Sequence, residues 1–151
     1  MKIMKLALIA VICFTFLFVS CGLWRYGSTL KSESNITYRN NVQIYKGASI
    51  SEENWSMIWN LLDVSERAPG ISKIVIFESE EESLGINIEE KFFDGYILGM
   101  VVVTWGGGLE LRNSQVYDEN GYIAFSVEIW EQLGPSTDDL RYDTFFLKIP
   151  K

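Results

Sequence analysis

Residues 96–105, Tyr-Ile-Leu-Gly-Met-Val-Val-Val-Thr-Trp, are almost continuously apolar. A run of this length is either a buried helix or a strand that is covered on both faces. The β-branched residues at 101–104 and the glycines that flank the run favour the strand. We therefore expect a strand whose two faces are both buried.

Two segments further along the chain alternate apolar and polar residues. These segments, 122–130 and 141–149, are predicted to be strands with one face on the core. Their inward positions are Ile123, Phe125, Val127, Ile129, Phe145, Leu147 and Ile149. Shorter strands are expected within 42–48, 73–77 and 84–88. Turn-forming residues separate the strands at 106–108, 118–121 and 134–139.

One segment has a clear helical period. It begins after Ser49 or Ser51, either of which can serve as an N-cap, and it ends before Pro69-Gly70. The apolar stripe of this helix consists of Trp55, Ile58, Trp59 and Leu62. We expect the two tryptophans to pack the helix against the sheet, and stacking on a ligand is the alternative.

Together these patterns predict an α+β fold in one domain, residues 42–151. The expected architecture is a single antiparallel sheet of about five to six strands packed against one amphipathic helix. A chain of 151 residues, of which 48% are hydrophobic, suffices for one such core and is too short for a second full domain.

The start of the chain has the pattern of an export signal. Residues 1–5 are cationic and residues 6–19 are apolar, a run shorter than the roughly twenty residues of a spanning helix. Phe18-Val19-Ser20-Cys21-Gly22 resembles the lipobox of bacterial lipoproteins, with Phe18 where leucine is usual. We expect residues 1–20 to be a lipoprotein signal peptide and Cys21 to be lipidated. An uncleaved signal anchor and an ordinary secreted protein are the alternatives.

The cysteine positions agree with lipidation. Cys13 would leave with the signal, so the mature chain would hold Cys21 alone, and acylation would remove its reactive thiol. Two or three acyl chains would hold the protein stably at a membrane. Residues 21–41 have no apolar period and are predicted to be a flexible tether with a reach of roughly 25 Å. The expected location is the bacterial cell envelope, outside the cytoplasm, on either membrane.

The composition excludes several kinds of site. The chain has no histidine, which is the usual general base near neutral pH and the commonest nitrogen ligand of zinc and copper. Histidine-based triads and zinc hydrolases are therefore excluded. The formal net charge is −7, and the scattered Lys and Arg residues give no basic stripe for a nucleic acid. We expect no nucleic-acid partner, no cofactor and no metal site.

The remaining polar motifs fit turns and solvated surfaces. The glycines at 106–108 lack the Lys-Ser/Thr and the helix that a P-loop requires, so a hairpin loop is expected there. The acidic run at 78–82 is expected to be a solvated loop. We predict a protein that is not an enzyme. The weaker alternative is a hydrolase that uses only carboxylates, such as Glu110, Glu128 or Asp143.

Four aromatic residues are candidates for contact with a partner or a ligand. Tyr122, Trp130, Tyr142 and Phe146 lie opposite the predicted core faces of the last two strands. Exposed, they would form a partner-binding patch, because tyrosine and tryptophan are frequent interface anchors. Carbohydrate binding through Tyr122 and Trp130 is a second possibility. Burial beneath the helix is a third.

The order of these features resembles a known family. The lipoprotein start is followed by residues 53–59 (Glu-Asn-Trp-Ser-Met-Ile-Trp), 73–77 (Lys-Ile-Val-Ile-Phe) and 146–151 (Phe-Leu-Lys-Ile-Pro-Lys). From residue 50 to 151 this arrangement is similar to that of the small PrcB-like lipoproteins, named for a subunit that stabilises a surface protease complex. The resemblance implies a non-catalytic accessory protein that binds another envelope protein, and it assigns no functional residue.

Overall fold

The computed structural model of the protein describes residues 27–62, 70–83, 85–131 and 139–151. The predicted signal peptide, Cys21, the first residues of the predicted tether, the predicted end of the helix and most of the turn at 134–139 lie outside the described residues. Within the part that is described, no helix has the length and apolar character needed to cross a membrane.

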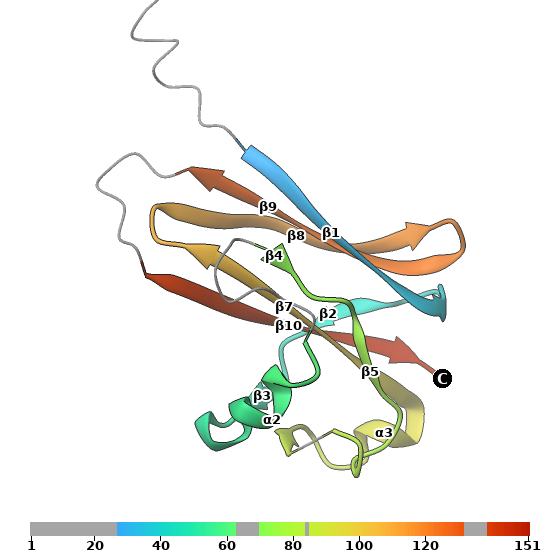
Figure 1. The fold of residues 1–151 in the computed structure, drawn as a ribbon. Coiled ribbons are helices and arrows are strands. Elements are labelled where there is room, and N and C mark those ends of the chain that lie inside the picture. Colours follow the sequence, from blue (N-terminus) through green and yellow to red (C-terminus); the bar gives the residue numbers. More distant parts are fainter. Residues whose placement is uncertain (1–26, 63–69, 84, 132–138) are drawn as a thin grey trace, which may run out of the picture.

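Strands dominate the described part of the chain (Figure 1). They are β1 (Gly27–Thr37), β2 (Gln43–Tyr45), β3 (Ser49–Ile50), β4 (Gly70–Ile71), β5 (Val75–Phe77), β6 (Ile86–Asn87), β7 (Tyr96–Gly106), β8 (Leu109–Glu119), β9 (Tyr122–Glu131) and β10 (Leu140–Pro150). The helical elements are the 3-10 turn η1 (Glu52–Asn54), α2 (Trp55–Trp59) and α3 (Phe92–Gly95).

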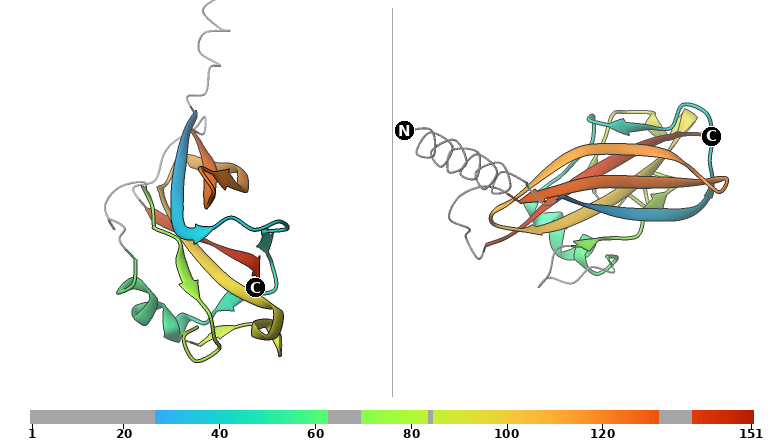
Figure 2. Two further views of the ribbon diagram at one scale, coloured as in Figure 1. Left: turned by 90° about the vertical axis from the view of Figure 1, so that its right-hand side faces the viewer. Right: turned by 90° about the horizontal axis from the view of Figure 1, so that it is seen from above.

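The strands form antiparallel sheets, as the sequence predicts. Sheet A has the order β1-β9-β8, and sheet B has the order β2-β10-β7-β4 with β5 also paired to β7. Strands β3 and β6 form a small third sheet. Sheets A and B stack face to face, with the short helices on the far side of sheet B (Figures 1 and 2). The prediction of one sheet with a single helix is therefore wrong.

The division into two sheets occurs at the three glycines. Strand β7 pairs with β10 along its whole length, from Tyr96↔Pro150 to Gly106↔Leu140, whereas β8 pairs with β9. The glycines thus form the corner at which the chain leaves sheet B for sheet A, and the predicted hairpin between paired strands is wrong. Gly108 has φ +87°, a left-handed conformation that glycine adopts without steric cost.

Two long strands, β1 and β8, were not predicted, because the apolar alternation is interrupted in both. In β1 two of the inward positions are serines, so the apolar alternation that would identify a strand is lost. In β8 a bulge between Arg112 and Gln115 shifts the alternation by one residue. Residues 27–37 are therefore a strand paired to β9, and the prediction of a tether over residues 21–41 is wrong for this part.

The protein has two apolar layers. The larger one lies between sheets A and B and includes Val101, Phe125 and Leu147. The smaller one lies between sheet B and the helical side and includes Ile58, Phe92 and Phe146. Strand β7 contributes to both layers and is buried almost throughout, as its continuous apolar sequence predicts.

The predicted helix is shorter than its sequence pattern. It consists of η1 and α2, and Ile58 is its fully buried residue. Trp55 and Trp59 are half-buried, and both rings contact Tyr142 of β10, with centroid distances of 4.6 and 5.5 Å. The stripe thus packs against sheet B as predicted, but its tryptophans stay partly open to solvent.

Candidate binding face

The four predicted contact residues do not form one surface. Phe146 is buried beneath the helical elements, as one alternative for these residues expects. Tyr142, 44% exposed, lies on the same side of sheet B. Tyr122 and Trp130 lie on the solvent side of sheet A, at opposite ends of β9. They lie eight positions apart along the strand, about 26 Å, which is too far for both rings to stack on one sugar.

The solvent side of sheet A is an open strand surface, and we name it the outer face. Its side chains alternate with the core residues of β9, so they point away from sheet B. It comprises Gly27, Thr29, Lys31, Glu33 and Thr37 of β1, Tyr122, Ala124, Ser126, Glu128 and Trp130 of β9, and Glu110, Arg112, Gln115, Tyr117 and Glu119 of β8. Seen from above, no described element covers these strands (Figure 2).

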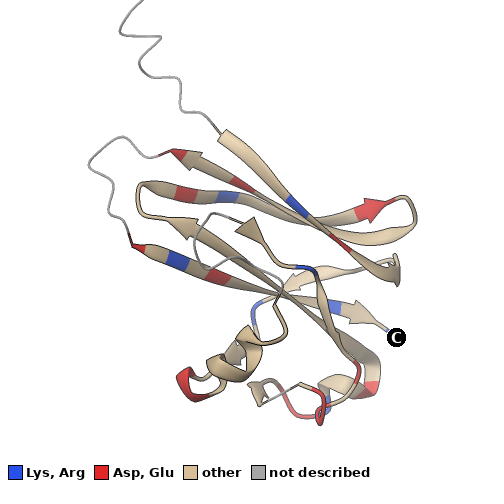
Figure 3. Cartoon of the chain, viewed as in Figure 1, with Lys and Arg blue, Asp and Glu red and all other residues tan. Residues whose placement is uncertain are grey.

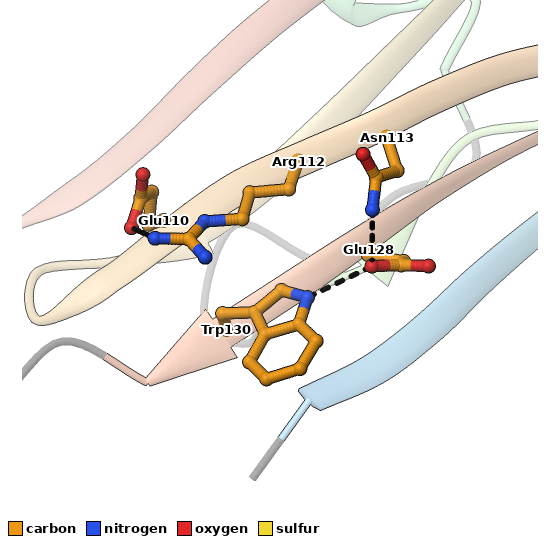
Figure 4. Close-up of polar contacts among 5 residues, drawn as sticks. All are labelled: Glu110, Arg112, Asn113, Glu128 and Trp130. Carbon is orange, nitrogen blue, oxygen red and sulfur yellow. Dashed lines mark hydrogen bonds and ion pairs between the residues drawn. The ribbon is translucent and has the colours of Figure 1, made fainter. Parts of the chain in front are cut away.

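In one half of the outer face, the carboxylate of Glu128 accepts hydrogen bonds from two neighbouring side chains (Figure 4). Trp130 Nε1 donates a hydrogen bond to Glu128 Oε2 at 2.9 Å, and Asn113 Nδ2 donates to the same oxygen at 2.8 Å. Arg112 lies over the Trp130 ring, 5.7 Å from its centroid, and pairs with Glu110 at 2.6 Å. Each contact fixes a long or aromatic side chain that would otherwise move freely.

Asn113 reaches Glu128 because of the bulge in β8. Its φ of +49° lies in the left-handed region, which asparagine tolerates better than most residues. A bulge adds a residue to one strand and redirects side chains. The sequence pattern did not indicate Asn113 and Arg112 as residues of this face. An asparagine within a strand of alternating residues is nevertheless a usable signal of such a bulge.

In the other half of the outer face, the side chain of Lys31 extends from β1 across β9 to β8. Lys31 Nζ of β1 lies 5.9 Å from the Tyr117 ring centroid and 3.6 Å from Glu119 Oε1, both on β8. The strand between them carries Ala124 and Ser126, whose small side chains leave room for this crossing and are themselves buried beneath it. The Tyr117 hydroxyl donates to Glu119 at 3.0 Å. Side-chain contacts between neighbouring strands thus occur in both halves of the outer face.

The contacts of the outer face shift the pKa values of its ionisable groups. The hydrogen bonds from Trp130 and Asn113 lower the pKa of Glu128 below its ordinary value. The charge of Glu119 raises the pKa of Lys31, and burial raises the pKa of Tyr117. Acidic and basic residues are interspersed on these strands (Figure 3), and the four glutamates of the outer face outnumber Lys31 and Arg112, so the face does not favour polyanions.

The three carboxylates of the hydrolase alternative lie on partly or fully exposed surface. Glu110 and Glu128 lie on the open outer face, and Asp143 is exposed on β10, where it accepts a hydrogen bond from Trp105 Nε1 at 3.0 Å. A general acid needs a raised pKa, whereas that of Glu128 is lowered. Two surface hollows are lined by residues such as Lys73 and Tyr45, and neither contains these three carboxylates. Among the described residues, no cluster of three or more metal-ligating side chains occurs.

Comparisons with known proteins identify no relative: no family model matches this chain, and no curated protein or solved structure matches it. The similarity to PrcB-like lipoproteins therefore stays a prediction from the sequence.

Proposed function

We propose that the protein is a non-catalytic lipoprotein of the bacterial cell envelope, anchored through Cys21, which binds another envelope protein through the outer face. The lipobox-like residues 18–22 and the resemblance to PrcB-like accessory proteins support the anchor and the role. A change in intact mass and in detergent partitioning that is lost in Cys21→Ala would establish the acylation.

The observation that carries the binding role is the set of side-chain contacts on the outer face. Tyrosine and arginine are among the residue types enriched in protein interfaces, and Tyr117 and Arg112 both contact neighbouring side chains here. Side chains that are ordered before binding lose less conformational entropy when a partner arrives. An open sheet surface that carries charges of both signs fits a folded protein better than a small ligand, which binds in concave sites.

Site-specific photocrosslinking in native envelopes tests this proposal. A crosslinking amino acid at Gln115, exposed on the outer face, is expected to yield one defined adduct. The matched control is Glu90, which is also exposed but lies outside the outer face, and it should yield none. The adduct should weaken when Arg112→Glu is added, because that change removes both the ring contact and the pairing with Glu110.

Two results would contradict the proposal. Equal adducts at Gln115 and Glu90 would indicate non-specific capture. An adduct at Gln115 that Arg112→Glu and Tyr117→Ala leave unchanged, in proteins with the circular dichroism of the wild type, would show that the outer face does not bind the partner.

A further inference from the structure

The tryptophans are concentrated at one end of the protein. The chain has five, and the four that the structure describes are Trp55, Trp59, Trp105 and Trp130. Trp105 is opposite Arg141 near the start of β10, and Trp130 is opposite Gly27 at the start of β1. Trp55 and Trp59 contact Tyr142, the third residue of β10. All four side chains are only partly buried.

Trp105 and Trp130 belong to the same end of the two stacked sheets, and Trp55 and Trp59 lie on the far side of sheet B, against Tyr142 near that end. The corner at residues 106–108 joins the end of β7 to the start of β8, and Gly107 N donates to Asp139 O at 2.8 Å beside the start of β10. Sheet A ends here with Trp130, whose ring lies over Gly27. Leu140, 38% exposed, and Tyr142 add open apolar surface. We call this the tryptophan end, defined by Trp55, Trp59, Trp105, Trp130, Leu140 and Tyr142.

The chain enters the fold at the tryptophan end, a short distance after the proposed anchor. Strand β1 begins at Gly27, so only residues 22–26 separate it from Cys21. Even fully extended, this stretch spans at most about 21 Å. Strand β1 itself is about 36 Å long for its eleven residues. A lipid anchor at Cys21 would therefore keep the start of β1 near the membrane. Tyr122, at the opposite end of sheet A, would lie well away from it.

We propose that the tryptophan end lies against the bilayer surface, with its aromatic rings at the level of the lipid headgroups. This inference rests on the lipid anchor proposed above. Tryptophan and tyrosine favour that region because an apolar ring and a polar N–H or O–H group are both satisfied there. The fifth tryptophan, Trp24, lies in the sequence between the anchor and β1.

A pair of labelled variants tests the orientation. Leu140→Cys and Tyr122→Cys place single reactive thiols at opposite ends, at positions of similar exposure, 38% and 46%. The acylated protein, verified by intact mass, is labelled with an environment-sensitive dye and reconstituted in protein-free vesicles of zwitterionic phospholipid. We expect the dye at position 140 to shift to shorter wavelength and to be quenched by brominated lipid. The dye at position 122 should show neither effect.

A measurement without labelled cysteines guards against misfolded variants. The intrinsic tryptophan fluorescence of acylated Trp24→Phe, which keeps the four described tryptophans, should also be quenched by brominated lipid. Equal signals from both dyes, or no signal from either with unquenched tryptophans, would overturn the orientation while the anchor stands. Shielding of position 140 in native envelopes but not in vesicles would show that a protein covers this end instead. Absence of acyl chains from the intact mass would overturn both the anchor and this inference.

Discussion

At the scale of single residues, Glu128 is the most informative side chain of the outer face. Its carboxylate accepts hydrogen bonds from Trp130 and Asn113, which hold its pKa below the ordinary value. A carboxyl group whose pKa is lower in the folded than in the unfolded state stabilises the fold above its unfolded pKa. That contribution is lost as the pH falls through the folded pKa.

Glu128→Gln should therefore lower the urea midpoint at neutral pH, and the difference from wild type should shrink once the pH falls below the folded pKa of Glu128. Unfolding followed by circular dichroism at neutral and acidic pH measures this. Glu131→Gln, at an exposed position at the end of the same strand, serves as the control and should change the midpoint little. A difference that is constant across pH would contradict the role of the ionised carboxylate.

The burial of single residues on β9 could be predicted from the sequence, whereas the position of Asn113 could not. Ile123, Phe125, Val127 and Ile129 are buried as their alternation predicts, because a period of two determines which face meets the core. The position of Asn113 beside Glu128 was not predictable, since the bulge that places it depends on the pairing of two strands. Whether Tyr142 and Phe146 are covered also depends on how far α2 extends over sheet B, which no local pattern determines.

At the scale of elements, β1 is the largest departure from the sequence interpretation. A strand whose inward positions are Leu30, Ser32, Ser34 and Ile36 has too few apolar residues to be recognised by itself. It forms because β9 offers backbone partners from Trp130 to Ala124 and again at Tyr122, with an irregularity in β1 between Glu33 and Thr37. The antiparallel character of the fold followed from the strand patterns, but the division into two sheets depended on β1 and β8, which those patterns did not reveal.

A mature chain that starts at Tyr38 should consequently lose stability, whereas one that starts at Gly27 should fold. Removing β1 deprives the core of Leu30 and Ile36, worth about 2–4 kcal/mol for two partly buried aliphatic side chains. It also turns β9 into a bare sheet edge that is prone to aggregation. Thermal unfolding and size-exclusion chromatography compare the two chains. Equal melting temperatures would restore the interpretation of residues 27–37 as part of a tether.

At the scale of the whole molecule, the stacked sheets relate the proposed anchor to the proposed binding face. The strands of sheet A run away from the tryptophan end, so an anchor there would set them upright on the bilayer. The outer face would then stand along the membrane normal, open to a neighbouring envelope protein. A tether of twenty residues would leave the orientation free, whereas the five residues before β1 restrict it.

The charge of the protein makes this contact depend on the lipid. Removing residues 1–20 takes away Lys2 and Lys5 and no acid, which changes the formal net charge from −7 to −9. Near the tryptophan end, Glu110, Glu131, Asp139 and Asp143 outnumber Arg112 and Arg141. Anionic headgroups repel such a surface. In the proposed orientation, contact with the bilayer therefore comes from the aromatic and apolar side chains.

We expect the blue shift of the dye at position 140 to decrease as anionic phospholipid replaces zwitterionic lipid in the vesicles. Added salt should restore it, because screening shortens the range of the repulsion. Glu131→Gln combined with Asp139→Asn removes two of the acids and should make the shift less sensitive to anionic lipid. A shift that grows with anionic lipid would mean that Arg112 and Arg141 dominate the contact, and the tryptophans would then not be what holds this end to the membrane.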